Sequence, residues 1–190
     1  SNKTGFNTKN WSGELRGNFY NHEEFDFERD NKHNIYTNYT AGGFLERNLG
    51  QRNTVKISFN HDVYNKYLFN EIDEVKEKSY GNIFNHFRAT YSNEQYTNHK
   101  LLFGAEIFNE ILKSDRFSSA QETHSVNDAV IIIQDEYSVN SKTTIVGGLR
   151  SGYHSAHSLH LSPSLTIKVS NGDFNYRVSY ARGFRSPTLK

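Results

Sequence analysis

Hydrophobic and polar residues alternate with a period of two along most of the chain, and this pattern predicts β-strands. The alternation is clearest over residues 159–169, where Leu, Pro, Ile and Val fall on one face and His, Ser, Thr and Lys on the other. After the sequence Ser-Asn-Gly-Asp at residues 170–173, the alternation resumes over residues 174–181. An Asn-Gly pair between two alternating runs is typical of a β-hairpin. We therefore predict that these two segments pair antiparallel.

Seven further strands are predicted upstream, centred on residues 11–19, 35–45, 55–63, 83–91, 100–108, 129–139 and 143–153. No segment of comparable length carries the period of 3.6 residues that marks an amphipathic helix. The charged run at residues 71–78 has helical propensity, but it lies between strand patterns and we interpret it as a loop. The whole pattern predicts an all-β fold, an antiparallel up-and-down meander of about nine strands.

The predicted connections alternate in length along the chain. Short connections lie at residues 48–53, 93–98, 140–142 and 170–173, whereas longer and more charged ones lie at 20–34, 64–82 and 109–128, with a shorter one at 154–158. Outer-membrane barrels have short turns at one end and long loops at the other. A soluble β-sandwich has no reason to sort its loops by end. The sorting therefore favours transmembrane strands. The sequence contains no run of roughly 18 apolar residues, so it does not predict a transmembrane helix.

The composition of the two strand faces fits the same interpretation. We expect Arg88, Arg150 and Arg177 to face a water-filled lumen, where they either guide an anionic ligand or form charge pairs. Aromatic side chains near the ends of the apolar faces are typical of the girdles of a membrane barrel. They are Tyr91, Tyr153, Phe174, Tyr176 and Tyr180. The alternative explanation for these residues is ordinary aromatic packing in the core of a soluble β-protein.

Composition narrows the function classes. The chain has 190 residues, with Lys+Arg 22 against Asp+Glu 21, and this balance argues against a nucleic-acid partner. Aromatic residues make up 14%, which indicates a folded chain. The chain has no cysteine, so it offers no disulfide and no thiol nucleophile. It also lacks the G-x-S-x-G, H-E-x-x-H, P-loop and G-x-G-x-x-G motifs, so we expect neither an enzyme nor a bound cofactor or metal.

Four short motifs follow one another in the second half of the chain. They are Q-D-E-Y at residues 134–137, G-G-L-R at 147–150, L-S-P at 161–163 and Y-A-R-G-F-R-S-P at 180–187. In this order they resemble the barrel of TonB-dependent outer-membrane receptors, and F-G-A-E at 103–106 is a weaker match. The resemblance implies a 22-stranded barrel closed by a separate plug domain. Residues 1–190 would then be a partial β-barrel domain, lacking the plug, the TonB box and the C-terminal strands.

The resemblance also implies a function in the bacterial outer membrane. Receptors of this family take up a chelated nutrient such as haem, an iron siderophore or cobalamin. The expected partners are the TonB complex, acting through the absent plug, the nutrient ligand, outer-membrane lipid and a surface lipoprotein. Two alternatives remain from the residues alone. One is a soluble or cell-surface β-domain for adhesion or glycan binding, and the other is a passive porin-like channel.

Two groups of residues are candidates for ligand binding. His154, His157 and His160 are spaced three apart. On an extended strand His154 and His160 share one side, whereas in a turn all three converge on a metal or haem iron. The alternative is a polar strand end that binds nothing. Arg185 lies in the sequence F-R-S-P, which is similar to the F-R-A-P box of haem receptors in this family. The alternative role of that box is a strand exit, with Pro187 ending the ladder.

Overall fold

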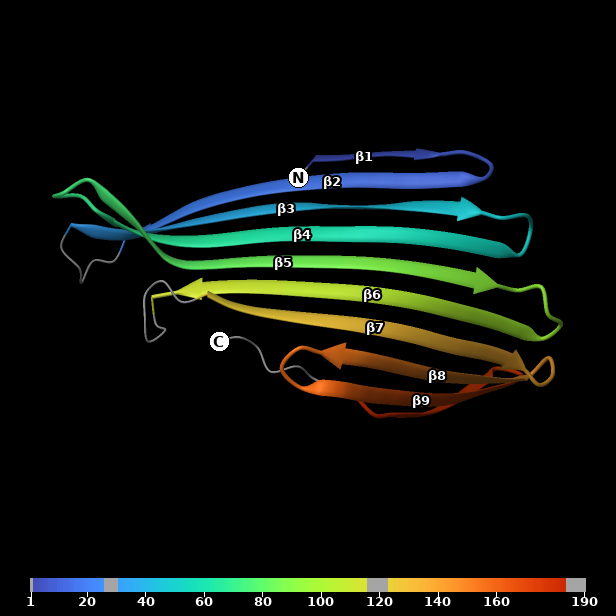
Figure 1. Ribbon diagram of the computed structural model, residues 1–190. Coiled ribbons are helices and arrows are strands. Elements are labelled where there is room, and N and C mark those ends of the chain that lie inside the picture. Colours follow the sequence, from blue (N-terminus) through green and yellow to red (C-terminus); the bar gives the residue numbers. More distant parts are fainter. Residues whose placement is uncertain (1, 26–30, 116–122, 184–190) are drawn as a thin grey trace.

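In a computed structural model, residues 2–25, 31–115 and 123–183 are described, and they form one continuous antiparallel sheet of ten strands (Figure 1). The order of the strands in the sheet is their order in the chain. The strands are β1 (Asn2–Asn7), β2 (Trp11–Phe25), β3 (Lys32–Asn48), β4 (Asn53–Asn70), β5 (Val75–Asn93), β6 (His99–Ser114), β7 (Thr123–Ser138), β8 (Thr143–His154), β9 (Ser158–Asn171) and β10 (Phe174–Ala181). The predicted up-and-down meander is confirmed, with β1 as one strand more than expected. The described residues contain no helix long and apolar enough to cross a membrane.

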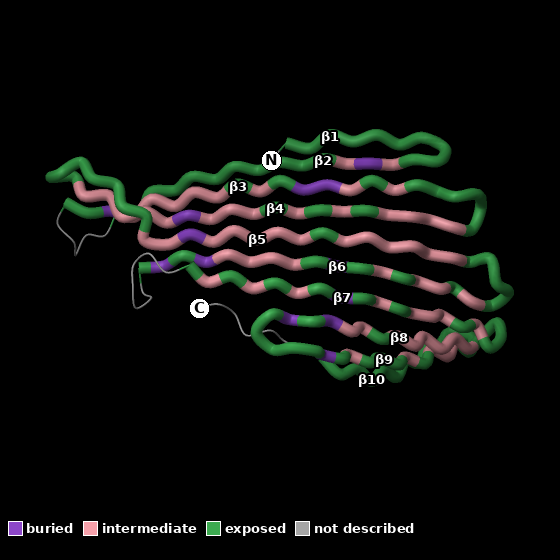
Figure 2. The backbone as a smooth tube through the Cα atoms, in the orientation of Figure 1, coloured by how far each residue is buried: buried purple, intermediate pink, exposed green. Residues whose placement is uncertain are grey.

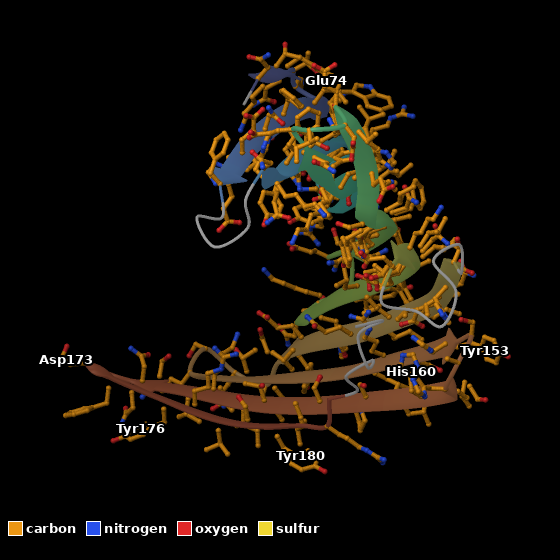
Figure 3. The ribbon with its side chains drawn as sticks, turned by 90° about the vertical axis from the view of Figure 1, so that its left-hand side faces the viewer. Glu74, Tyr153, His160, Asp173, Tyr176 and Tyr180 are labelled. Carbon is orange, nitrogen blue, oxygen red and sulfur yellow. The ribbon has the colours of Figure 1, made fainter. Side chains whose placement is uncertain are left out.

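The sheet curls in one direction and stays open. Figure 3 looks onto its end and shows an arch, with β1 and β10 as two separate edges. The curl follows from the right-handed twist of strands, which closes a larger sheet into a barrel when the strands tilt. We call the concave side the inner face and the convex side the outer face. An open arch of this kind is consistent with a slice of a larger barrel.

Alternation along the paired strands assigns each side chain to one face. Phe59, Phe87 and Ile107 are direct neighbours across β4, β5 and β6, and they lie on the outer face, 43%, 45% and 56% exposed. The adjacent position on β6, Glu106, lies on the inner face and is only 3% exposed. On β10, Tyr176 points away from the hollow of the arch (Figure 3). The outer face is therefore apolar and uncovered, while the inner face is polar.

Almost no hydrophobic side chain is buried. Among the described residues, Leu112 and Val130 are the buried hydrophobic side chains, and most of the large exposed ones lie on the outer face. Figure 2 shows how few positions are buried in any strand. A soluble sandwich would bury one face against a second sheet. We call the exposed apolar side chains of the outer face the apolar band. An exposed apolar surface of this extent marks a contact with another protein or a membrane.

A row of polar side chains interrupts the apolar outer face toward the end of the sheet where β2–β5 project, and Tyr39, Val63 and Ile83 form an apolar row beyond it. His61 Nδ1 lies 2.6 Å from Asn85 Oδ1, and the Asn85 amide donates to Asn109 Oδ1 at 3.1 Å. Asn109 in turn donates to Asn127 Oδ1 at 2.8 Å. These outer-face residues neighbour one another on β4–β7, so the ladder satisfies its own amide groups directly beside the Phe59–Phe87–Ile107 row.

The prediction of a loop at residues 64–82 is wrong. β4 continues to Asn70, a tight turn occupies residues 71–74, and β5 begins at Val75. The charged run at 71–78 is therefore a turn followed by strand. Lys76 lies on the strand with its ammonium 4.3 Å from the Tyr67 ring centre. The backbone ladder outweighs the low strand propensity of charged residues here, since propensity in strands depends on cross-strand packing. The ends of the sheet thus differ in how far strands extend.

A bulge at Ser79 changes the direction of this extension. Lys66 pairs with Tyr80 and Tyr67 pairs with Lys78, so Ser79 is one residue too many in the ladder. Its hydroxyl donates to the Lys66 carbonyl at 3.3 Å. A bulge bends its strand and increases the local twist. This accounts for the crossing of the β2–β3 and β4–β5 extensions in Figure 1.

The hairpin predicted at residues 170–173 is present between β9 and β10. Asn171 pairs with Phe174, so the two-residue loop consists of Gly172 and Asp173. Gly172 has a φ of +60°, a left-handed conformation that a side chain disfavours. Glycine at the first loop position is typical of a type II′ turn, whose twist matches that of the flanking strands.

We predict that Gly172→Ala lowers the free energy of unfolding of the intact protein by about 1 kcal/mol. Gly147→Ala is the matched control, because Gly147 has a negative φ and nothing lies within 4 Å of an added Cβ. Urea unfolding of both variants measures the difference. Equal stability of the two variants would contradict a turn that depends on the left-handed glycine.

Candidate functional site

A network of three charged side chains lies on the inner face. Arg150 Nη2 is 2.8 Å from Glu106 Oε2, and Arg88 Nε is 3.3 Å from Glu106 Oε1. The residues come from β5, β6 and β8, so Arg150 reaches over β7, where Val130 is 2% exposed. The carboxylate side chain is 3% exposed, while the side chains of Arg88 and Arg150 are 42% and 41% exposed. Two guanidinium groups therefore compensate one buried charge and still face the hollow of the sheet.

Arg177, the third predicted lumen charge, does not join this network. It lies on β10, directly opposite Lys168 of β9, and it is exposed. Lys168 in turn pairs with Glu136 at 3.8 Å. The structure thus places all three arginines on the inner face and brings two of them together.

The three predicted histidines gather at one corner of the sheet. His154 and His160 lie on the inner face of β8 and β9, 2% and 8% exposed, and His157 lies exposed in the turn between them. The rings of His154 and His157 stack with 4.8 Å between centroids. His160 Nε2 lies 3.9 Å from Asp128 Oδ2. His154 Nδ1 accepts a hydrogen bond from the Ala156 amide at 3.1 Å.

The missing side chain of Gly152 makes room for His160. The two residues are direct cross-strand neighbours, and a Cβ at Gly152 would lie 2.5 Å from the imidazole. The ring therefore rests on the backbone of β8, as a cross-strand side chain does over a strand glycine. This arrangement keeps His160 buried beside Asp128.

A hollow of about 490 Å³ joins the histidine corner to the arginine network. Its wall includes Phe84, Phe108, Asp128, Arg150, His154 and His160. The Phe108 ring stacks on His86 with 4.3 Å between centroids, and the Arg150 guanidinium lies 5.8 Å from the Phe108 ring centre. Aromatic, cationic and imidazole groups therefore converge. Such a set has the chemistry that suits a planar or anionic ligand.

Metal coordination is a separate question. Among residues 2–25, 31–115 and 123–183, no group of three or more His, Cys, Asp or Glu side chains is arranged to hold a metal ion. In this part of the chain, the histidines therefore form a cluster of stacked and hydrogen-bonded rings.

A second cluster lies further along the inner face, where the strands project beyond the polar row at His61. Four tyrosines and a histidine follow one another across β2–β5, with ring centroids 5.8–6.4 Å apart. They are Tyr20, His22, Tyr36, Tyr64 and Tyr80. Lys66 Nζ lies 5.5 Å from the Tyr36 ring centre. The cluster forms an aromatic wall that continues the inner face outward.

Tyr36 is anchored within this wall. Its hydroxyl donates to Glu24 Oε2 at 2.6 Å, and this hydrogen bond, together with burial, raises the pKa of Tyr36 to about 12. Tyr36 lies on the part of β3 that projects beyond the apolar band, where it pairs with Lys66. The phenol therefore stays neutral at physiological pH and donates to the carboxylate.

Sequence reasoning missed the tyrosine wall. Its members come from four strands, and only the register between those strands brings them together. The available signal was the position of Tyr20, His22 and Tyr36 on polar faces. Tyr36 was expected on a strand, but the segments that carry the other four rings, residues 20–34 and 64–82, were expected to be loops. Arg185 and its F-R-S-P sequence lie outside the described residues.

The comparisons with known proteins agree with this geometry. The family model for the TonB dependent receptor-like beta-barrel matches residues 2–190. The chain therefore belongs to the TonB-dependent receptor-like β-barrel family. A search of curated proteins gave no match.

A solved structure extends the comparison to the fold. The siderophore receptor PirA from Pseudomonas aeruginosa superposes with a TM-score of 0.77 at 17% sequence identity. The match covers 97% of this chain and 32% of that receptor, so the chain spans about a third of the receptor's length. At this identity the likeness shows the fold, a segment of a receptor barrel.

We predict that the two arginines of the network compensate for each other. Arg88→Gln and Arg150→Gln each leave one guanidinium on Glu106, whereas the double variant leaves a buried carboxylate without compensation, which costs about 3 kcal/mol or more. The loss of unfolding free energy in the double variant should therefore exceed the sum of the single losses.

Urea unfolding of the full-length receptor measures the free energy of unfolding of the parent protein, the two single variants and the double variant. Arg177→Gln is the control on the same face and should have an effect within about 0.5 kcal/mol of zero. Additive losses in the double variant would show that the two arginines do not share Glu106.

Proposed function

We propose that the chain forms part of the barrel wall of a bacterial outer-membrane receptor that takes up a chelated nutrient. The observation that carries the proposal is the division of one sheet into two faces. The outer face is an exposed apolar band, suited to lipid, and the inner face collects charged and aromatic side chains. Membership in the TonB-dependent receptor family supports this function.

Among the nutrients considered, an anionic iron chelate of the siderophore type has the best support. Arg150 and the Phe108 ring face the same hollow, which suits a ligand with aromatic groups and negative charge. The structural likeness to a siderophore receptor points the same way. Haem is the second candidate. His154 Nδ1 already accepts a backbone hydrogen bond, so exposed His157 is the imidazole that a haem iron would reach. In the part of the chain that the structure describes, we find no comparable feature that favours cobalamin.

The proposed partners follow from the rest of the receptor. The edge strands β1 and β10 each present unpaired backbone groups, which further barrel strands would satisfy in a membrane. The TonB complex would act through a plug domain, and outer-membrane lipid would cover the outer face. A surface lipoprotein would be a further partner at the projecting end.

The first test is growth of a strain that lacks the intact gene. Haem, a ferric siderophore or cobalamin is supplied in turn as the limiting nutrient, with and without a proton uncoupler. We expect a growth defect on the ferric siderophore alone, and loss of uptake by the uncoupled parent strain. Uptake that survives the uncoupler would indicate a passive channel. Normal growth on all three nutrients would contradict the proposed cargo.

We further predict that Phe108→Ala weakens binding of that siderophore to the full-length receptor about tenfold, since an aromatic contact contributes roughly 1 kcal/mol beyond its buried area. Phe87→Ala is the matched control, because Phe87 is exposed on the outer face of the neighbouring strand. Calorimetric titration measures both affinities. Equal affinities would show that the ligand does not use this part of the inner face.

A further inference from the structure

An apolar groove lies on the outer face at the other side of the sheet. It has a volume of about 450 Å³ and crosses β1–β4. Its walls include Phe6, Gly13, Leu15, Leu45, Ile57 and Phe59. Phe6, Gly13, Leu45 and Ile57 form one cross-strand row, and Leu15, Gly43 and Phe59 form the next. The groove therefore belongs to the face that carries the apolar band.

Two glycines explain why this part of the band is hollow. The Phe6 ring lies over Gly13, where an added Cβ would be 2.6 Å from Phe6 Cε1. The Leu15 side chain lies over Gly43 in the same way, 2.8 Å from the position of a Cβ. Phe6 and Leu15 thus lie close to the backbone, and the surface beside Leu45 stays low.

A cationic side chain lies at one end of the groove. Arg47 follows Leu45 on the same face of β3, toward the short turns, and it is exposed. Its guanidinium lies 4.9 Å from the Trp11 ring centre, which holds it at the level of that ring. Lys9 and Arg52 lie in the two adjacent turns at the same end. The groove is thus apolar along its length and positively charged where it meets the turns.

We propose that this groove binds an anionic phospholipid of the periplasmic leaflet, with an acyl chain along Leu45 and Ile57 and the phosphate at Arg47. The inference rests on the proposed function, because it requires the outer face to lie in a bilayer. Short turns mark the periplasmic end of such barrels. A guanidinium binds phosphate oxygens through paired N–H donors, and clustered cations attract anionic headgroups. Charge complementarity therefore selects phosphatidylglycerol over a phospholipid without net charge.

The test uses the full-length receptor in nanodiscs of equal parts phosphatidylglycerol and phosphatidylcholine. After extraction into detergent, native mass spectrometry counts the lipids that the protein retains. We expect the receptor to retain phosphatidylglycerol preferentially, and Arg47→Gln to reduce that preference about fivefold. Lys142→Gln should leave it unchanged, because Lys142 lies in another turn at the same end of the sheet, away from the groove.

A second pair of variants tests the apolar part. Leu45→Trp fills the groove and should remove the retained lipid, while Ile131→Trp adds the same bulk elsewhere on the outer face and should not. Both positions are exposed, so neither substitution disturbs a buried side chain.

The experiment distinguishes failure of the lipid site from failure of the proposed function. A receptor that inserts into the nanodisc but retains both lipids equally, or responds alike to Arg47→Gln and Lys142→Gln, overturns the lipid site alone. A protein that does not insert into the bilayer overturns the lipid site together with the proposed function.

Discussion

The continuous antiparallel hydrogen-bond ladder is the constraint on which the rest of the structure depends. Ten strands pair in chain order, and the one register shift recorded among the described residues lies between β4 and β5, in the projecting extension. Because side chains alternate along each strand, this register decides which face every residue occupies. A slip of one residue on β6 would exchange buried Glu106 with exposed Ile107. In hydrocarbon, each unpaired backbone group would cost several kcal/mol, so a sheet that spans a membrane has to keep its ladder complete.

The polar side chains of the inner face pair with one another where the register of the strands places them close together. Arg150 reaches across β7, where Val130 is buried, to pair with Glu106. His160 reaches Asp128 because Gly152 has no side chain. These contacts hold aromatic and cationic groups toward the hollow of the inner face. On the outer face, the corresponding polar network is the amide ladder that interrupts the apolar band. One backbone arrangement thus produces an apolar face and a polar face.

The sequence was most informative where alternation is strict. The β9–β10 hairpin was predicted because Asn171 and Gly172 separate two alternating runs. β1 was missed because Phe6 is its only large apolar residue, and its pairing with β2 supplies what the pattern lacks. The extensions of β4 and β5 were expected to be a loop, because the charged run at residues 71–78 lies between the two strand patterns. Arg88 and Arg150 were assigned to the correct face, but their shared partner Glu106 and the tyrosine wall depend on register, which a single sequence does not specify.

The central claim is that one face of this sheet contacts lipid and the other contacts water. Ile107 and Phe108 test it directly, because they are adjacent on β6 and lie on opposite faces. Residues 1–190 contain no cysteine, and any cysteine elsewhere in the receptor is replaced before labelling. Single-cysteine variants of the full-length receptor carry a spin label in lipid nanodiscs. We predict that the label at residue 107 collides mainly with dissolved oxygen and the label at residue 108 mainly with a water-soluble nickel chelate. High nickel accessibility at both positions would contradict the account.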